Sequence, residues 1–65
     1  MTKIIKAAEI GHSIIAISQD KYSMCYIVTL NESEGYYFKQ TSRRAYGTLK
    51  QAQARYNHLL RRITP

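Results

Sequence analysis

The sequence predicts an α+β fold: an antiparallel three-stranded β-meander followed by one C-terminal α-helix packed on one face of the sheet. Two observations indicate this class. In "YSMCYIVTL", residues 22–30, one set of alternate positions is more apolar than the other, which is the period of a half-buried strand. In the last third of the chain, apolar residues instead recur every three or four positions, which is the period of an amphipathic helix.

Three segments are expected to form the sheet. The first is "HSIIAIS", residues 12–18, which is rich in β-branched residues and is followed by turn chemistry at Asp20. The second is residues 22–30. The third is "YYFKQTS", residues 36–42, and the polar segment "NESEG" before it predicts a hairpin loop whose Gly35 is left-handed.

The first ten residues allow two interpretations. The segment "KIIKAAEI" is compatible with a short extra strand or with a helical turn, and the pattern does not choose between them. Without an extra strand, residues 12–18 would form an exposed sheet edge. A second copy of the chain could pair with that edge, so the sequence allows a homodimer.

The helix has a defined beginning and one apolar stripe. Thr48 followed by Gln51 predicts a capping box, with Gly47 just outside the helix. The stripe consists of Leu49, Ala52, Tyr56, Leu59, Leu60 and Ile63. Lys50, Asn57 and Arg61 flank it on one side, and Arg55 and Arg62 on the other.

The alternation predicts which sheet face the helix covers. The covered face is expected to carry Tyr36 and Phe38 of the third strand and the more apolar set of the second: Tyr22, Met24, Tyr26, Val28 and Leu30. Burying Lys39 instead would require a partner for its charge. Tyr37, Lys39 and Thr41 are therefore expected on the open face, together with Ser23, Cys25 and Thr29.

Length and composition limit the remaining possibilities. The 65 residues predict a single small domain, 1–65. One cysteine, Cys25, excludes an intramolecular disulfide and a Cys-rich zinc site, and no metal or cofactor is expected. No apolar run is long enough for a signal sequence or a membrane span, so we expect a cytoplasmic protein without a membrane partner.

The charges are divided unevenly along the chain. Residues 1–34 carry three Lys against four acidic side chains, a net charge of −1, whereas residues 35–65 carry seven basic side chains and no acidic one, so that the total is +6. Such an asymmetry favours a polyanionic partner, either a nucleic acid or an acidic protein surface. The candidate binding residues are Tyr37, Lys39, Thr41, Arg43, Arg44, Tyr46, Lys50, Arg55, Arg61 and Arg62.

Catalysis is not expected. His12 and His58 lie far apart in the sequence and outside any catalytic pattern, and Cys25 is placed in the middle of a predicted strand. The four acidic residues are scattered, so no pair of carboxylates suggests acid–base chemistry.

The segment "GYYFKQTSRRAYGTLKQAQARYNHLL" resembles the closing strand, loop and helix of arm-type DNA-binding domains, which stand at the N-terminus of phage and transposon integrases. The resemblance covers less than half of the chain. It implies a sheet laid in the major groove of DNA, with Tyr37, Lys39, Thr41 and Arg43 on the contacting face. Those domains precede a catalytic domain, whereas we expect this chain to stand alone, as small phage and mobile-element accessory proteins do.

The expected function is that of a small, basic, non-enzymatic nucleic-acid-binding accessory protein, with DNA as the first candidate ligand. The alternative is a phage- or mobile-element-encoded inhibitor that binds a host enzyme or defence complex through the same basic surface.

Overall fold

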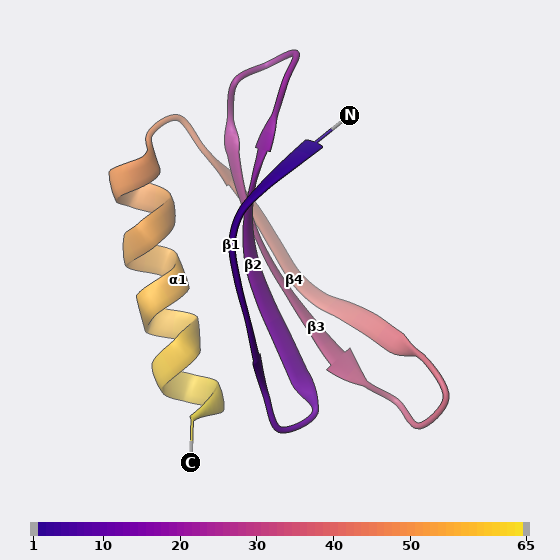
Figure 1. Ribbon diagram of the computed structural model, residues 1–65. Helices are drawn as coiled ribbons and strands as arrows, with labels where there is room; N and C mark the ends of the chain where they lie inside the picture. The colour runs from indigo at the N-terminus through magenta and orange to yellow at the C-terminus, as the bar shows by residue number, and fades with distance from the viewer. Residues whose placement is uncertain (1, 65) are drawn as a thin grey trace.

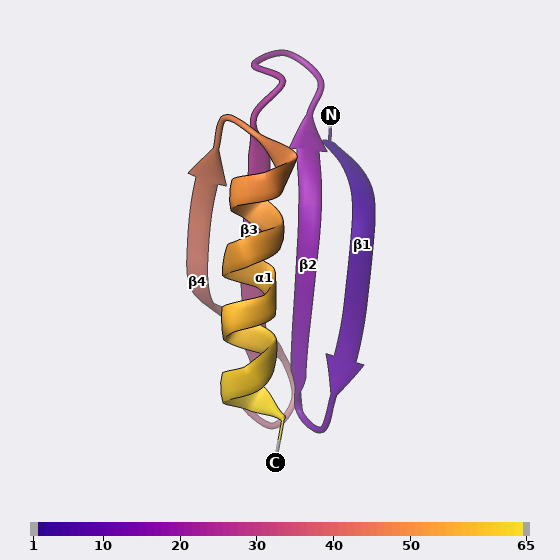
Figure 2. The same ribbon diagram turned by 90° about the vertical axis from the view of Figure 1, so that its left-hand side faces the viewer.

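The computed structural model describes residues 2–64, so the predicted domain, 1–65, extends one residue beyond this range at each end. Four strands form one antiparallel sheet in the order β1-β2-β3-β4, and one helix packs on it (Figures 1 and 2). The elements are β1 (Thr2–Ile10), β2 (Ser13–Asp20), β3 (Tyr26–Ser33), β4 (Phe38–Tyr46) and α1 (Leu49–Ile63). The α+β class and the C-terminal helix are confirmed, but the prediction of three strands is wrong.

The additional strand is β1, in the segment for which the sequence left two interpretations open. It pairs with β2 through a two-residue turn, and Ile10 lies opposite Ser13. Gly11, the first turn residue, has a φ of +60°, which glycine adopts without the steric cost that a side chain would add. Because β2 now lies between β1 and β3, residues 12–18 do not form the predicted edge; the edges are β1 and β4.

The turn between β2 and β3 is longer than predicted and shortens the second strand at its start. The Asp20 carboxylate accepts hydrogen bonds from the Ser23 hydroxyl at 2.8 Å and from the Tyr22 amide at 3.2 Å. The amide of Met24 donates to the Asp20 carbonyl at 2.8 Å, and Met24 has a φ of +61°. Tyr22 is therefore 87% exposed rather than part of the core, and Met24 is exposed as well.

The turn also changes the acidity of Asp20. The hydrogen bond from the Ser23 hydroxyl, followed by the one from the Tyr22 amide, stabilises the charged carboxylate and lowers its pKa below the ordinary value.

The strand β4 runs four residues further than predicted and contains a β-bulge. Ser42 lies opposite Leu30, but Gln40 lies opposite Asn31, so Thr41 is an extra residue on β4. The hairpin before β4 has the predicted left-handed glycine, because Gly35 has a φ of +94°. Phe38, however, is 52% exposed, so its predicted burial beneath the helix is wrong.

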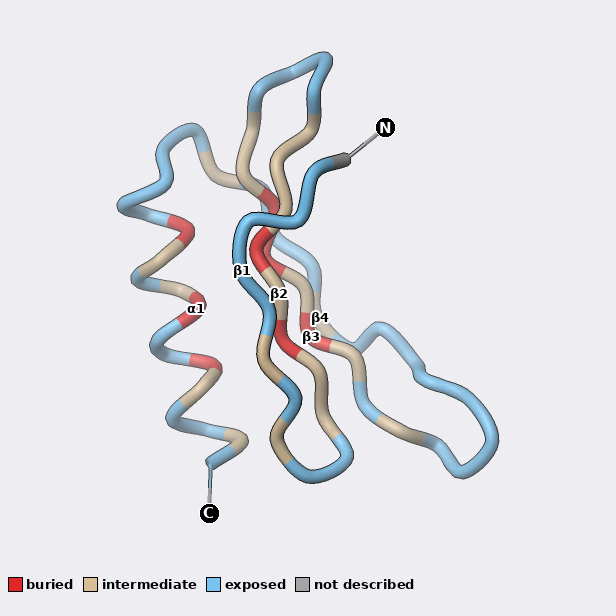
Figure 3. Tube along the Cα trace, viewed as in Figure 1, coloured by how far each residue is buried: buried red, intermediate tan, exposed pale blue. Residues whose placement is uncertain are grey.

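The helix begins where its sequence predicts and packs through most of the predicted stripe, although Leu49 is 43% exposed. The Thr48 side chain accepts a hydrogen bond from the amide of Gln51 at 3.3 Å, which caps the first turn. Tyr56, Ala52 and Leu59 are buried on the inward surface of α1, as Figure 3 shows in red. They meet the central strands in one core, whose strand residues are Ile15, Ile17, Val28 and Leu30.

The register divides the sheet into two sides. The helix side is the sheet face that packs against α1, together with α1 itself, and the open side is the opposite sheet face. Residues paired across antiparallel strands share a side. One row on the helix side is Lys6–Ile17–Val28–Arg44, and the neighbouring row on the open side is Ala7–Ala16–Thr29–Arg43.

Candidate nucleic-acid interface

The basic side chains gather on the helix side. Eight of the ten Lys and Arg residues lie there: Lys3, Lys6, Lys39, Arg44, Lys50, Arg55, Arg61 and Arg62. Among residues 2–64, the only carboxylate on this side is that of Glu32, because Glu9 pairs with Ile14 on the open side and the other two acids lie at the strand ends and turns. The asymmetry seen along the sequence is therefore an asymmetry between the two sides of the sheet.

The edge strands place cations on both flanks of the helix. In Figure 2, α1 lies over β2 and β3, with β1 on one flank and β4 on the other. Lys6 and Arg44 occupy equivalent places on these two strands, at opposite ends of one row, and both are exposed. The helix is therefore framed by positive charge that does not have to be buried.

The predicted contact face on β4 is not a single face. Arg43 pairs with Thr29 on the open side, whereas Lys39 pairs with Glu32 on the helix side. The extra residue in the bulge, Thr41, reverses the alternation between them. The expectation that Tyr37, Lys39, Thr41 and Arg43 share the open face is wrong.

The predicted place of Arg43 and Arg44 between two elements is also wrong, because both belong to β4. They are neighbours in the sequence and lie on opposite sides of the sheet, since Arg44 pairs with Val28 above the core. Only Arg44 faces the same side as the helix cations.

A groove of about 420 Å³ lies between α1 and the β3–β4 pair. Its lining residues are Leu30, Glu32, Thr41, Ser42, Arg55, Leu59, Arg62 and Ile63. Arg55 and Arg62 both line the groove from α1, which agrees with the prediction that they lie on the same flank of the helix. The groove therefore combines two guanidinium groups, two hydroxyls, one carboxylate and an apolar floor.

One donor of a groove-lining side chain has no acceptor within residues 2–64. Arg55 is half-buried, and its Nε is shielded from solvent without a hydrogen-bond partner. An N–H group left in this state costs about 1–3 kcal/mol relative to a satisfied one. No ion pair within residues 2–64 joins it to Glu32, whose carboxylate instead accepts a hydrogen bond from the Thr41 hydroxyl at 3.3 Å.

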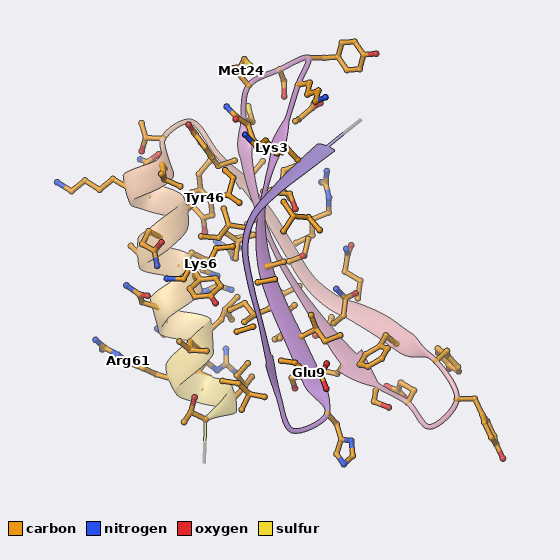
Figure 4. All side chains as sticks on the ribbon, in the orientation of Figure 1. Lys3, Lys6, Glu9, Met24, Tyr46 and Arg61 are labelled. Atoms are coloured by element: carbon orange, nitrogen blue, oxygen red, sulfur yellow. The ribbon has the colours of Figure 1, made fainter. Side chains whose placement is uncertain are left out.

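The remaining predicted residues are spread over the molecule. Tyr37 and Tyr36 lie in the β3–β4 hairpin and are exposed, at the far end of β4 from Tyr46. Tyr46 is half-buried against the core, opposite Tyr26, so its ring is largely committed to packing. Lys50 lies in the first helical turn, and Arg61 points away from the sheet in Figure 4.

Lys3 and Lys6 also belong to this surface, although they were not among the predicted binding residues. Both lie on β1, and Figure 4 shows Lys6 directed toward the helix. Its ammonium nitrogen lies 5.0 Å from the centre of the Tyr56 ring, within the range of a cation–π contact. A strand prediction for "KIIKAAEI" would have made the two lysines candidates. Residues three apart in a regular strand face opposite sides, and the two lysines share a side only because of the bulge between Ile4 and Lys6.

The groups considered for catalysis lie on three different parts of the fold. His12 lies in the turn between β1 and β2, and His58 lies on the exposed surface of α1. Cys25 is a half-buried free thiol that precedes β3. No helix within residues 2–64 has the length and apolarity needed to cross a membrane.

A comparison of the chain with family models, curated proteins and solved structures finds no match. The resemblance to arm-type domains therefore stays a prediction.

Proposed function

We propose that this protein binds nucleic acid, with DNA as the first candidate, through the helix side and without chemistry of its own. The observation that carries the proposal is the collection of eight cations against one carboxylate on that side. Lys and Arg side chains neutralise phosphates and release counterions, so a surface of this kind favours binding to a sugar–phosphate backbone. Backbone contacts alone carry little sequence information, so the binding is expected to be weakly sequence-specific.

The proposed orientation differs from the one that the resemblance implies. A sheet laid in a DNA groove would present the open side, on which Arg43 lies opposite Thr29 and Glu9 lies opposite Ile14. A face with one positive and one negative side chain gives little electrostatic attraction for a polyanion. The helix side supplies that attraction, and its two flanks allow phosphates to be contacted on either side of α1.

A protein-binding inhibitor is the second candidate function. Exposed apolar side chains on the open side favour it, because Ile4 is 66% exposed and Phe38 is 52% exposed there. Apolar surface of this kind is common at protein contacts and does not help to bind phosphates.

Anisotropy of a labelled 20-base-pair duplex and of the matching single strand, measured over a salt series, tests the first proposal. With about four to six phosphates contacted, log K against log salt should fall on duplex DNA with a slope of about −4 to −5. A flat slope, or no binding at low salt, contradicts the proposal. Capture of a host protein from lysate that survives nuclease treatment would then favour the inhibitor.

A further inference from the structure

We propose that the groove between α1 and β4 holds a segment of sugar–phosphate backbone, with a phosphate on Arg55 and Arg62 and the adjoining sugar over the apolar floor. This inference rests on the proposed nucleic-acid binding and names the place where one strand is held. It also separates these two arginines from the other cations of the helix side, none of which lines this groove.

The first argument is the unsatisfied donor. The Nε of Arg55 is buried and has no acceptor, whereas guanidinium groups are well suited to phosphate because their N–H groups match two of its oxygens. A phosphate that binds the same guanidinium would supply the missing acceptor once the Arg55 side chain shifts, because the Nε itself is closed to solvent in this structure. An exposed arginine such as Arg61 gains less, because water already satisfies its donors.

The second argument is the arrangement of the walls. Arg62 follows Arg55 by two helical turns, which is about 10 Å along the axis, so the two side chains enter the groove from different heights. The opposite wall carries the hydroxyls of Thr41 and Ser42. The Thr41 hydroxyl has only long contacts, 3.3 Å to Glu32 and 3.4 Å to the Leu30 carbonyl, so it is available to a better partner.

The third argument is size and polarity. The volume of about 420 Å³ lies in the range of about 300–1,000 Å³ that is typical of small-ligand sites, and it exceeds what a single phosphate needs. Leu30, Leu59 and Ile63 line the same space and offer apolar contact for sugar carbons. A ligand with a charged group beside an apolar one fits such a groove better than a simple anion does.

Glu32 opposes the binding of any anion here, and this makes the inference testable. Its carboxylate lines the groove, so it repels a bound phosphate at short range. Glu34 carries the same charge but lies in the hairpin outside the groove. Replacing each by Gln changes the net charge equally and the groove charge unequally.

The test uses the intact chain and three probes: inorganic phosphate, thymidine, and a thymidine dinucleotide with one internal phosphodiester. Binding is followed by NMR through the Nε–Hε signal of Arg55. The dinucleotide should shift this signal saturably and more tightly than either inorganic phosphate or thymidine. No saturable shift with the dinucleotide overturns the inference, and equal affinity for inorganic phosphate shows a bare anion site instead.

Matched variants then locate the site. Arg62→Gln should weaken dinucleotide binding about five- to tenfold, and Arg61→Gln less than about twofold. Of these two arginines, Arg62 lines the groove and Arg61 does not. Glu32→Gln should tighten dinucleotide binding by about threefold and Glu34→Gln by much less. Equal effects within either pair overturn the inference, because they would reflect net charge alone.

The same variants separate this inference from the proposed function. If the chain binds duplex and single strand but Arg62→Gln and Arg61→Gln weaken both polymers equally, nucleic-acid binding stands and the groove assignment fails. If the dinucleotide binds in the groove but neither polymer binds at low salt, the groove holds a nucleotide ligand and the proposed function fails.

Discussion

The helix side and the open side are built from alternate residues of the same four strands, yet they differ in charge and in burial. On the helix side, the row Lys6–Ile17–Val28–Arg44 has an apolar centre and a cation at each end. The neighbouring row, Ala7–Ala16–Thr29–Arg43, is shifted by one residue on each strand and therefore lies on the open side. It has small side chains and a single cation. The helix buries the centre of the first row and leaves its charged ends in solvent.

This contrast explains how a small domain can be strongly basic and still have a dry core. Within residues 3–64, the buried strand residues all belong to the two central strands, and the cations of the sheet's helix side stand on the edge strands, on the flanks of α1. The desolvation cost of a buried charge is thereby avoided. The buried sheet residues and the sheet cations are consequently different positions, so burial and charge can be perturbed separately.

The largest expected effect concerns burial. Ile17 is 0% exposed on the helix side and Ile4 is 66% exposed on the open side. Ile17→Ala should lower the free energy of unfolding by about 2–5 kcal/mol, because it leaves a cavity beneath α1. Ile4→Ala should change it by no more than about 0.5 kcal/mol. Urea unfolding measures both, and equal losses would mean that the open side is covered in solution.

The next effect concerns binding and uses adjacent residues. Arg44→Ala should weaken duplex binding about three- to tenfold, or about 0.7–1.4 kcal/mol, because it removes a helix-side cation. Arg43→Ala should weaken it less than about twofold, because that side chain faces the open side. Both variants should melt like the wild type, since exposed charges contribute little to stability. The reverse order of effects would restore the sheet-in-groove orientation.

A smaller effect concerns the contact that joins β1 to the helix. Lys6→Gln keeps part of the side-chain stem but removes the charge above the Tyr56 ring, so the free energy of unfolding should fall by about 0.5 kcal/mol at low salt. Lys3→Gln, on the same strand and side, removes one positive charge as a control. If both variants lose the same stability, the ring contact contributes nothing beyond net charge.

The smallest effect lies in the turn at Asp20, outside both sides. Ser23→Ala removes the hydroxyl that donates to the carboxylate, so the lowered pKa of Asp20 should rise toward its ordinary value. Because the folded-state pKa is the lower one, the stabilisation is present above the unfolded pKa and is lost as the pH falls through the folded pKa. An NMR titration of the Asp20 carboxyl carbon measures the change. An unaltered pKa would assign the shift to the Tyr22 amide.

Local patterns were sufficient for much of the architecture. The 3.6-residue period and the Thr48 cap located α1, and the polar loop with Gly35 located the last hairpin. The identity of Tyr26, Val28 and Leu30 as the helix-facing set of β3 also followed from alternation, and they do pack in or against the core. These features depend on residues close together in the chain, so the sequence contains the information that decides them.

The candidate site was less predictable, because the pairing register of the strands decides which residues lie on the helix side. Lys50, Arg55, Arg61 and Arg62 were recognisable as helix cations from their spacing alone. Lys3 and Lys6 were missed because a segment with two lysines and three isoleucines has no decisive period until β2 pairs with it. The groove was not visible in the sequence at all, since it needs Thr41 and Arg55 to meet across two elements.

By itself, the sequence determined the α+β class, the extent of the helix and the excess of basic residues in the second half of the chain, because each is a property of composition or of short-range period. Only the tertiary structure decided the fourth strand and the side on which each charge lies. For β4, the physical reason is the single extra residue at Thr41. Side chains alternate with a period of two along a strand, so a shift of one residue exchanges the two sides for the residues before it. It carries Lys39 to the helix side and Phe38 to the open side, and a bulge of this kind is set by the pairing of β3 with β4.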